Sequence, residues 1–305
     1  MKITFCGAAK IVTGSCYLIE LDSKESKSKN KKGKKYLVDC GMFQGPKEIS
    51  EKNYQSFPFD PKKISAVFLT HAHIDHSGLL PKLKKHGFKG KIYSTSATAD
   101  LCEVMLADSA HVQEMNTKDK NKERAEEGKK PLKPLYNSQD AHKTQKLFKK
   151  ISYNKKQKID SNLSVRFQDA GHIVGSSIIE VFVKESSGKS KKPKEKKLVF
   201  SGDLGQWKSM IVKSPSIVEK GDYVFVESTY GNRLHESDKK AMKKLKKALK
   251  RTYKKQGKLM IPSFAVERTQ QLIHAFKMLQ EKGKFPNEKV FLDSPLAIKV
   301  TKIFS

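Results

Sequence analysis

The stretch FLTHAHIDHSG at residues 68–78 constrains this chain most, because it places three histidines and an aspartate within six positions directly after a short apolar run. The run ends at Leu69 and indicates a strand, so His71 and His73 alternate along the loop that follows and can point the same way. Asp75 and His76 are adjacent and diverge towards a second point. Imidazole nitrogens and carboxylate oxygens are typical zinc ligands. The spacing therefore favours a site for two neighbouring metal ions over a polar surface loop.

The bulk composition allows a large folded protein and leaves the charge open to two interpretations. The chain has 305 residues, of which 37% are hydrophobic, so it can bury a sizeable core. Its formal net charge of +30 would attract nucleic acid or an anionic membrane. Only five of the 62 basic residues are arginine, however, and arginine is usually preferred where phosphate is gripped by two hydrogen bonds. A general lysine bias explains the charge equally well.

The sequence shows no export signal or membrane anchor. The N-terminal stretch MKITFCGAAKIVTG has a polar, glycine-broken strand pattern, and no later apolar run approaches the length of a membrane span. We therefore expect a cytoplasmic protein with no membrane partner. The four cysteines include no C-x-x-C pair, which argues against a disulfide framework or a zinc knuckle and favours buried thiols.

Short β-branched and aromatic runs alternate with glycine and polar breaks through most of the chain. Residues 96–116 have apolar side chains at helical spacing and predict a helix, and the polar, proline-broken residues 117–137 predict a surface excursion. Lysine-rich inserts at 22–35 and 184–197 each lie between two strand-like runs and predict solvated hairpin loops. The predicted strands are 2–9, 15–22, 34–41, 64–73, 91–95, 163–171, 176–185, 196–205 and 222–231.

The pattern changes at Ser237, where an amphipathic basic helix begins. Its apolar stripe of Met242, Leu245 and Leu249, which Tyr253 could extend, is predicted to face the core. Residues 257–283 then predict a strand, a turn and a helix, and residues 288–305 predict the start of a second such unit. Because that unit stops before its crossover is complete, we expect the sequence to be a fragment of a longer protein.

Three further candidate ligands lie at the ends of apolar runs, where loops place functional groups on a rigid sheet. They are Asp39 in YLVDCG, His172 in DAGHIVGSS and Asp203 in LVFSGDLG. Taken singly, each is equally well explained as a turn former or a structural residue. Their order along the chain, Asp, then H-x-H-x-D-H, then G-H, then S-G-D, resembles the metallo-β-lactamase superfamily over essentially the first 230 residues.

Within that superfamily, the chain resembles the β-CASP group of RNA-processing nucleases. The stretches that carry this resemblance include DCGMFQG, THAHIDHSGLLP, ESTYGNRLH, IPSFAVERTQ and FLDSPLA. ESTYG and PSFAVERTQ matter most, because they lie beyond what a generic hydrolase of this fold would share. The resemblance implies an α/β fold, with a metallo-β-lactamase αββα sandwich over residues 1–231 and the beginning of an inserted β-CASP α/β domain over residues 232–305.

The resemblance also implies two Zn²⁺ ions per chain. Asp39 would accept hydrogen bonds that orient the ligands from behind them. The implied metal ligands are His71, His73 and His172 for one ion, Asp75 and His76 for the other, and Asp203 as the bridge between them.

Further roles follow from the same resemblance. Glu227 would orient a histidine that acts as general acid, and this histidine and one more zinc ligand are expected beyond residue 305. Ser263 and Arg268 are equally well explained as a helix cap and an exposed helix residue. The implied catalytic residues are Asp75, Asp203 and Glu227, and the implied substrate contacts are Ser263, Arg268 and Ser294.

These features predict a zinc-dependent ribonuclease that hydrolyses RNA phosphodiester bonds by a two-metal mechanism, in RNA processing or degradation. RNA would be its partner, a homodimer is one open form of assembly, and endo- and exonucleolytic cleavage stay open. One alternative is a hydrolase of the same fold that acts on DNA or on a small-molecule ester. Another is an inactive β-CASP scaffold or RNA-binding subunit, although every ligand position within reach is filled. The fragment itself is expected to lack part of the active site.

Overall fold

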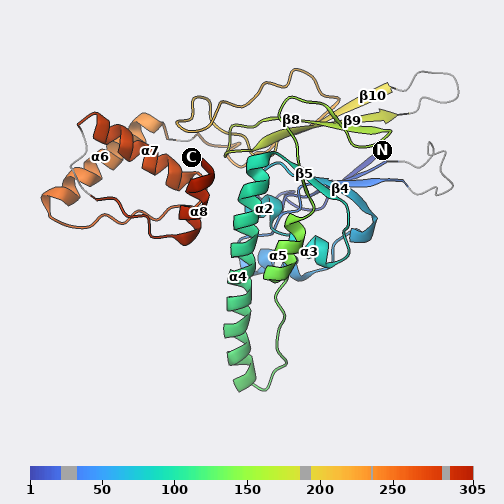
Figure 1. The fold of residues 1–305 in the computed structure, drawn as a ribbon, viewed down its shortest axis with the longest axis horizontal. Coiled ribbons are helices and arrows are strands. Elements are labelled where there is room, and N and C mark those ends of the chain that lie inside the picture. The colour runs from blue at the N-terminus through green and yellow to red at the C-terminus, as the bar shows by residue number, and fades with distance from the viewer. Residues whose placement is uncertain (22–32, 186–193, 235, 284–288, 305) are drawn as a thin grey trace.

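Two β-sheets stacked face to face form the centre of the molecule in the computed structural model, which describes residues 1–21, 33–185, 194–234, 236–283 and 289–304 (Figure 1). The first sheet has the order β1-β2-β3-β4-β5-β6. Its first three strands pair antiparallel and β3 to β6 pair parallel. The strands are Lys2–Phe5, Tyr17–Glu20, Lys35–Val38, Ile64–Phe68, Lys91–Ser94 and Phe148–Lys150.

The second sheet has the order β11-β10-β9-β8-β7. It is antiparallel except for the parallel pair β10 and β11. The strands β7 to β11 are Gln157–Lys158, Leu163–Asp169, Ser177–Glu185, Lys194–Phe200 and Tyr223–Phe225.

Alternating side chains divide the core into two layers. Tyr36 and Phe68 point into the space between the sheets and are at most 1% exposed, where they meet Phe167 of the second sheet. Leu37 and Val67 are adjacent to these residues on the same strands. Their side chains point to the opposite face of the sheet and are fully buried against the helices. Successive side chains of a strand point to opposite faces of the sheet, and here both faces are buried. The strand sequences are therefore almost continuously apolar.

Helices cover the outer face of the first sheet (Figure 1). On the outer face of the second sheet, Leu204 and Val218 pack against Ile178 and Val199. The α/β class and the two-sheet sandwich expected from the sequence are confirmed. The helices of this part are α1 Lys47–Ser50, α2 Ile74–Ser77, α3 Leu80–Lys85, α4 Ser96–Glu126 and α5 Ser138–Gln145, with short 3₁₀ turns at Glu51–Tyr54 and Pro61–Lys63.

Helix α4 is ten residues longer than the sequence pattern indicated, so the expected surface excursion from residue 117 is wrong over its first part. Residues 117–126 are rich in Lys, Glu, Arg and Ala, which favour the helix, and the first proline comes only at Pro131. Gly128, with a φ of +66°, directs the chain away after the helix ends. The end of α4 and the returning chain extend beyond the body of the molecule (Figure 1).

The C-terminal part contains α6 Asp238–Lys254, α7 Arg268–Glu281 and α8 Pro295–Phe304. Helix α8 packs against α4, and Val300 is fully buried in the core beneath it. The strands expected at the start of 257–283 and of 288–305 are absent from the described residues of these segments, where Met260 and Phe291 are more than 80% exposed. A strand needs a neighbouring strand for its backbone groups, and the described chain offers none there.

The predictions for the apolar stripe of α6 and for the two lysine-rich inserts need correction. The apolar stripe of α6 is only half-buried at Met242 and Leu249, so it is not core. Most of the lysine-rich inserts lie outside the described residues, but Lys35 starts β3 and residues 194–197 belong to β10, so the ends of both inserts are strand rather than loop. The domain boundary after residue 231 falls between β11 and α6 and stays a prediction.

The cysteines and the helices also bear on the sequence-based expectations. All four cysteines are free thiols, and Cys16, Cys40 and Cys102 are buried. Within the described residues, no helix combines the length and the apolar character that crossing a bilayer requires.

Candidate metal centre

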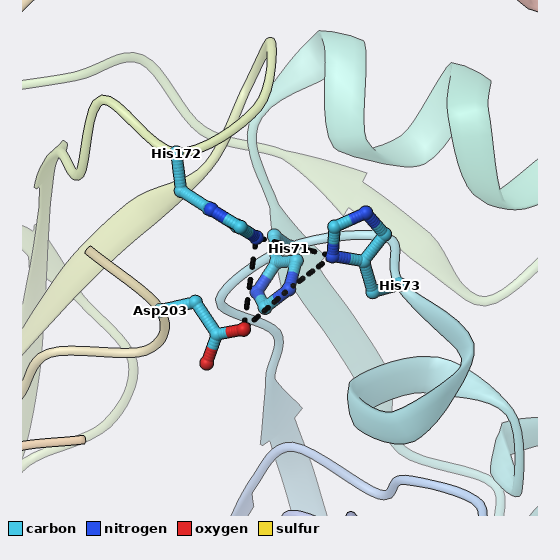
Figure 2. Close-up of side chains that lie close together, drawn as sticks. All are labelled: His71, His73, His172 and Asp203. Atoms are coloured by element: carbon cyan, nitrogen blue, oxygen red, sulfur yellow. Dashed lines mark hydrogen bonds and ion pairs between the residues drawn. The ribbon is translucent and has the colours of Figure 1, made fainter. Parts of the chain in front are cut away.

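Loops at one end of the two sheets bring together four side chains that could bind a metal (Figure 2). His71 and His73 follow β4, His172 follows β8, and Asp203 follows β10. Each offers one ligand atom, and these four atoms all lie within 4.8 Å of one another. The side chains point towards a common centre although they come from three separate parts of the sequence.

The spacing of these atoms fits a bound cation. Nδ1 of His73 lies 3.1 Å from Nε2 of His71 and 3.1 Å from Nε2 of His172. Oδ2 of Asp203 lies 3.8 Å and 3.6 Å from the same two Nε2 atoms. Tetrahedral zinc with bonds of 2.0–2.2 Å would separate its ligands by roughly 3.3–3.6 Å. Three imidazoles and one carboxylate are a donor set that zinc accepts.

A second group of ligand-type atoms adjoins the first. Nε2 of His76 lies 3.2 Å from Oδ1 of Asp203 and 4.0 Å from Oδ2 of Asp75. The two oxygens of Asp203 therefore face different groups, with Oδ2 towards the three histidines and Oδ1 towards His76. All six side chains for which the sequence suggested metal binding meet at this place, and the Asp203 carboxylate lies between the two groups.

Asp39 lies behind the candidate ligands and forms hydrogen bonds with the groups around them. Its carboxylate is 1% exposed and accepts hydrogen bonds from the backbone N–H of Thr70 at 2.8 Å, from the Thr70 hydroxyl at 2.9 Å and from the Ser15 hydroxyl at 3.2 Å. It also lies 2.7 Å from Nδ1 of His76. The carboxylate favours a proton on Nδ1, so Nε2, which faces Asp203 and Asp75, is the nitrogen that could bind a metal.

Burial and neighbouring charges prepare the group for a cation. Burial and the nearby His172 lower the pKa of His73 to about 3, and burial lowers the pKa of His71 well below its usual value. Burial disfavours the charged form of Asp203, but the hydrogen bond and the charge of His76 outweigh it and lower the pKa of Asp203 to about 2. His71 and His73 are therefore neutral and Asp203 is ionised near neutral pH, which are the protonation states that metal ligands need. Burial favours the neutral form of His76, but the carboxylates of Asp39 and Asp203 outweigh it and raise the pKa of His76 well above its usual value, so a metal ion would have to displace a proton from this imidazole.

Two glycines allow the loops to approach closely. A Cβ atom on Gly41 would lie 1.6 Å from the carbonyl oxygen of Asp75, and one on Gly205 would lie 1.5 Å from the carbonyl oxygen of Gly171. The first glycine lets the chain after Asp39 pass against the metal-ligand loop. The second lets the chain after Asp203 pass against the loop of His172. Any side chain at these two positions would push the ligand loops apart.

A cavity of about 310 Å³ opens beside His76 and Asp203. Glu227 lines it, and its position is fixed because its carboxylate accepts hydrogen bonds from the backbone N–H of Thr229 at 2.9 Å and of Leu204 at 3.4 Å. The cavity is large enough for part of a substrate and lies against the second group of ligand-type atoms. Glu227 is thus close to the candidate metal centre without belonging to it.

The three residues expected to contact substrate do not line this cavity. Ser263 and Arg268 are exposed, and the Arg268 guanidinium donates to Oε1 of Gln271 at 2.8 Å. The Ser294 hydroxyl accepts from the backbone N–H of Ala297 at 3.2 Å, as expected for the N-terminal cap of α8. Their contact with substrate stays a prediction.

Sequence reasoning missed the hydroxyl groups that support the site. Ser15 and Thr70 hold Asp39, and the Ser176 hydroxyl accepts the backbone N–H groups of His172 and Ile173 at 3.0 Å and 3.3 Å. Thr70 and Ser176 lie within the stretches FLTHAHIDHSG and DAGHIVGSS, which contain candidate ligands, and Ser15 directly follows the N-terminal stretch MKITFCGAAKIVTG. The only signal in the sequence is their adjacency to the ligand motifs, because serine and threonine are common in any loop.

Comparison with known proteins agrees with this geometry. Residues 10–143 match the family model of the metallo-β-lactamase superfamily. The chain is 33% identical over 304 residues to ribonuclease TTHA0252 of Thermus thermophilus, which covers 100% of this chain and 61% of that protein. It is 31% identical over 298 residues to transcription termination factor FttA of Methanosarcina mazei, covering 96% of this chain and 42% of that protein.

A eukaryotic protein is also similar to most of this chain. The chain is 26% identical over 277 residues to cleavage and polyadenylation specificity factor 73 of Drosophila melanogaster, covering 90% of this chain and 35% of that protein. The chain thus spans between about a third and about three fifths of the length of these curated relatives. Their names agree with the resemblance to β-CASP nucleases. By the family match of residues 10–143, with which the two-sheet sandwich and the histidine and aspartate loops agree, the chain contains a metallo-β-lactamase domain.

Proposed function

We propose that this chain carries the catalytic metal centre of a zinc-dependent ribonuclease that acts in the cytoplasm. The observation that carries the proposal is the convergence of His71, His73, His172 and Asp203 on one point. The relatives named as a ribonuclease, a transcription termination factor and a cleavage factor support RNA as the substrate. The net charge of +30 favours the same polyanion.

In phosphodiester hydrolysis, the residues of the site would bind the two metal ions. When bound, two zinc ions would supply Lewis acidity to a water molecule and to the phosphate oxygens. His71, His73 and His172 would hold one ion, His76 and Asp75 the other, and Asp203, whose two oxygens face the two groups, would contribute to both.

The remaining groups orient the ligands and handle the leaving group. Asp39 keeps His76 in the tautomer that presents Nε2. Glu227, held at the cavity by two backbone N–H groups, would orient the group that protonates the leaving 3′-oxygen. Ser263, Arg268 and Ser294 are proposed as phosphate contacts along the C-terminal part.

Cleavage assays on the full-length protein test the proposal. One RNA, labelled at either end, and its DNA counterpart are incubated with the protein, with and without a chelator, and then after zinc is restored. We expect the protein to cleave RNA, the chelator to stop cleavage, and zinc to restore it. The product lengths distinguish internal cleavage from cleavage at an end.

Two variants make the assay specific to the site. His73→Ala should abolish cleavage and reduce the bound zinc, because a ligand is lost, whereas His142→Ala removes an exposed histidine of α5 and should leave both unchanged. RNA cleavage by His73→Ala at the wild-type rate would remove the centre from the mechanism. Cleavage of DNA but not RNA would favour the alternative hydrolase, and bound zinc without any cleavage would favour a scaffold. Light scattering on the same protein tests whether it forms a homodimer.

A further inference from the structure

Helix α6 begins a segment whose charge differs from that of the rest of the chain. Residues 239–258 contain 11 of the 62 basic residues and none of the 32 acidic residues. A general lysine bias would raise lysine everywhere, so what distinguishes this segment is that more than half of its 20 residues are basic while none is acidic. Other stretches without acidic residues are less basic, with seven basic residues in 141–159 and five in 76–99, and on the protruding end of α4 and the chain after it, residues 117–133 contain seven basic and four acidic residues.

The basic side chains of α6 form a continuous exposed row. Lys243, Lys247, Lys250 and Lys254 lie at i, i+4, i+7 and i+11, so they follow one face of the helix, and all four are exposed. This row is about 16 Å long at 1.5 Å per residue. Among the described residues, Lys244 of α6, which lies beside the row, forms an ion pair with Glu236 at 2.7 Å. The four ammonium groups of the row are thus free to meet an external anion.

The opposite face of α6 argues against a membrane as that anion. A helix that inserts into a bilayer needs a free apolar face, with large aromatic or leucine side chains available for insertion. Here Met242, Leu245 and Leu249 are already half-buried within the protein, which leaves Tyr253 as the single exposed large side chain of the stripe. A phosphate backbone requires only the cationic face.

The chain that leads to α6 starts at the cavity beside His76 and Asp203. Thr229 lines the cavity, and Asp238, where α6 begins, is only nine residues further on, so the start of the helix lies within about 32 Å of it. Between them, the guanidinium of Arg233 lies 4.6 Å from the centre of the Tyr230 ring, and both side chains are exposed. A cation beside an aromatic ring is a surface on which a nucleotide base can stack.

We propose that the exposed lysine row of α6 is a binding surface, separate from the metal centre, that holds the phosphate backbone of single-stranded RNA without regard to sequence. The row deepens the proposed ribonuclease function and rests on it for the choice of RNA as the polyanion. Each lysine that meets a phosphate releases counterions, so binding must weaken with salt by a log–log slope of about 0.7 for each contact on a single strand. Four contacts therefore contribute a slope of about 3.

The test measures binding of a labelled 20-nucleotide poly(U) and of poly(A) to the full-length protein at several salt concentrations. EDTA is present throughout, so that binding does not depend on metal or on cleavage. In the test variant Lys243, Lys247, Lys250 and Lys254 are changed to Gln, which keeps a strong helix former at each position. We expect affinity for both RNAs to fall about tenfold or more at low salt and the salt slope to fall by about 3.

Two matched variants separate the lysine row from net charge and from folding. The first changes Lys118, Lys120, Lys130 and Lys133, four exposed lysines on the protruding end of α4 and the chain after it, to Gln and should leave the slope near the wild-type value. The second changes the four lysines of the row to Arg, which keeps their charge, and should bind like the wild type. Circular dichroism checks the helix content of every variant.

The outcomes distinguish this proposal from the catalytic one. An unchanged slope in the Gln variant of the row overturns the proposal, and so does an equal loss in the variant of α4, because net charge alone would then explain binding. Loss of binding to vesicles of anionic lipid, with RNA binding unchanged, would assign the row to a membrane instead. If the protein binds poly(U) through the row but cleaves no RNA with zinc restored, the binding surface stands and the ribonuclease function falls.

Discussion

At the scale of single residues, the site depends on side chains that hold the ligands as much as on the ligands. Asp39 is buried, has a φ of +59°, and contacts Thr70, Ser15 and His76 with its two oxygens. The H-x-H-x-D-H spacing made the ligand loop predictable, because few other structures need so many imidazoles in one turn. The approach of His172 to His73 was not predictable from spacing, since 99 residues separate them and only the packing of the two sheets brings them to 3.1 Å.

Asp39→Asn tests this supporting role. The amide cannot accept all of the hydrogen bonds that the carboxylate accepts, and its NH₂ group would oppose a proton on Nδ1 of His76. We expect zinc affinity and RNA cleavage to fall about 10- to 100-fold while the fold is retained. Competition with a zinc-binding dye and thermal unfolding measure the two effects. Asp60→Asn, at an exposed carboxylate that caps a 3₁₀ turn, is the control, and equal losses in both variants would contradict the role of Asp39.

At the scale of helices and strands, local sequence predicted what depends on near neighbours. The strands β1 to β5 and β8 to β11 were predicted from their largely apolar runs, whereas β6 and β7 were missed because they are short and largely exposed. The strands expected at the start of 257–283 and of 288–305 were wrong, because a strand depends on a partner that local sequence does not specify. The backbone conformation of Glu267 could not be predicted from the sequence either. It precedes α7 with φ 66° and ψ −60°, a rarely populated combination that indicates local strain.

Glu267→Gln should change the pH dependence of stability. Burial raises the pKa of Glu267 to about 7, above that of the unfolded chain, so the folded state holds the proton more tightly. The stability gained from the neutral form is present at low pH and is lost as the pH rises through about 7. The Gln variant cannot ionise, so its urea midpoint should exceed that of the wild type at pH 8 and match it near pH 4.5.

Glu281→Gln, at an exposed position at the other end of α7, is the control for this measurement. It should shift neither midpoint. A wild-type midpoint that responds to pH in the same way as the midpoint of Glu267→Gln would show that Glu267 does not titrate in this range.

Asn121→Ala tests what orders the chain after α4. The Asn121 side chain accepts from the backbone N–H of Leu132 at 2.7 Å and donates to its carbonyl at 3.0 Å. Without these hydrogen bonds, we expect faster amide hydrogen exchange over residues 128–135 and little change in the thermal midpoint, because this segment lies outside the core. Asn116→Ala, at an exposed position of the same helix, should leave exchange unchanged. Unchanged exchange in Asn121→Ala would mean that other contacts order the segment.

At the scale of the whole molecule, two sheets and their loops assemble one centre from three separate parts of the sequence. The family could be inferred from the order of its motifs, whereas the distances within the centre needed the three-dimensional structure. Gly41 and Gly205 show why, since the close passage of the loops depends on missing side chains that a sequence pattern cannot place in space. The basic surface of α6 was visible in the sequence only as a charged helix, and its exposed row of lysines emerged from the structure.

Anomalous X-ray diffraction at the zinc edge, from crystals of the full-length protein prepared with zinc, tests the central claim most directly. The account predicts one anomalous peak within bonding distance of Nε2 of His71, Nδ1 of His73 and Nε2 of His172, and a second beside Nε2 of His76, with the carboxylate of Asp203 between them. In crystals of His73→Ala, the first peak should weaken or vanish. Ordered side chains at these positions with no anomalous peak among them would contradict the claim that they form a metal centre.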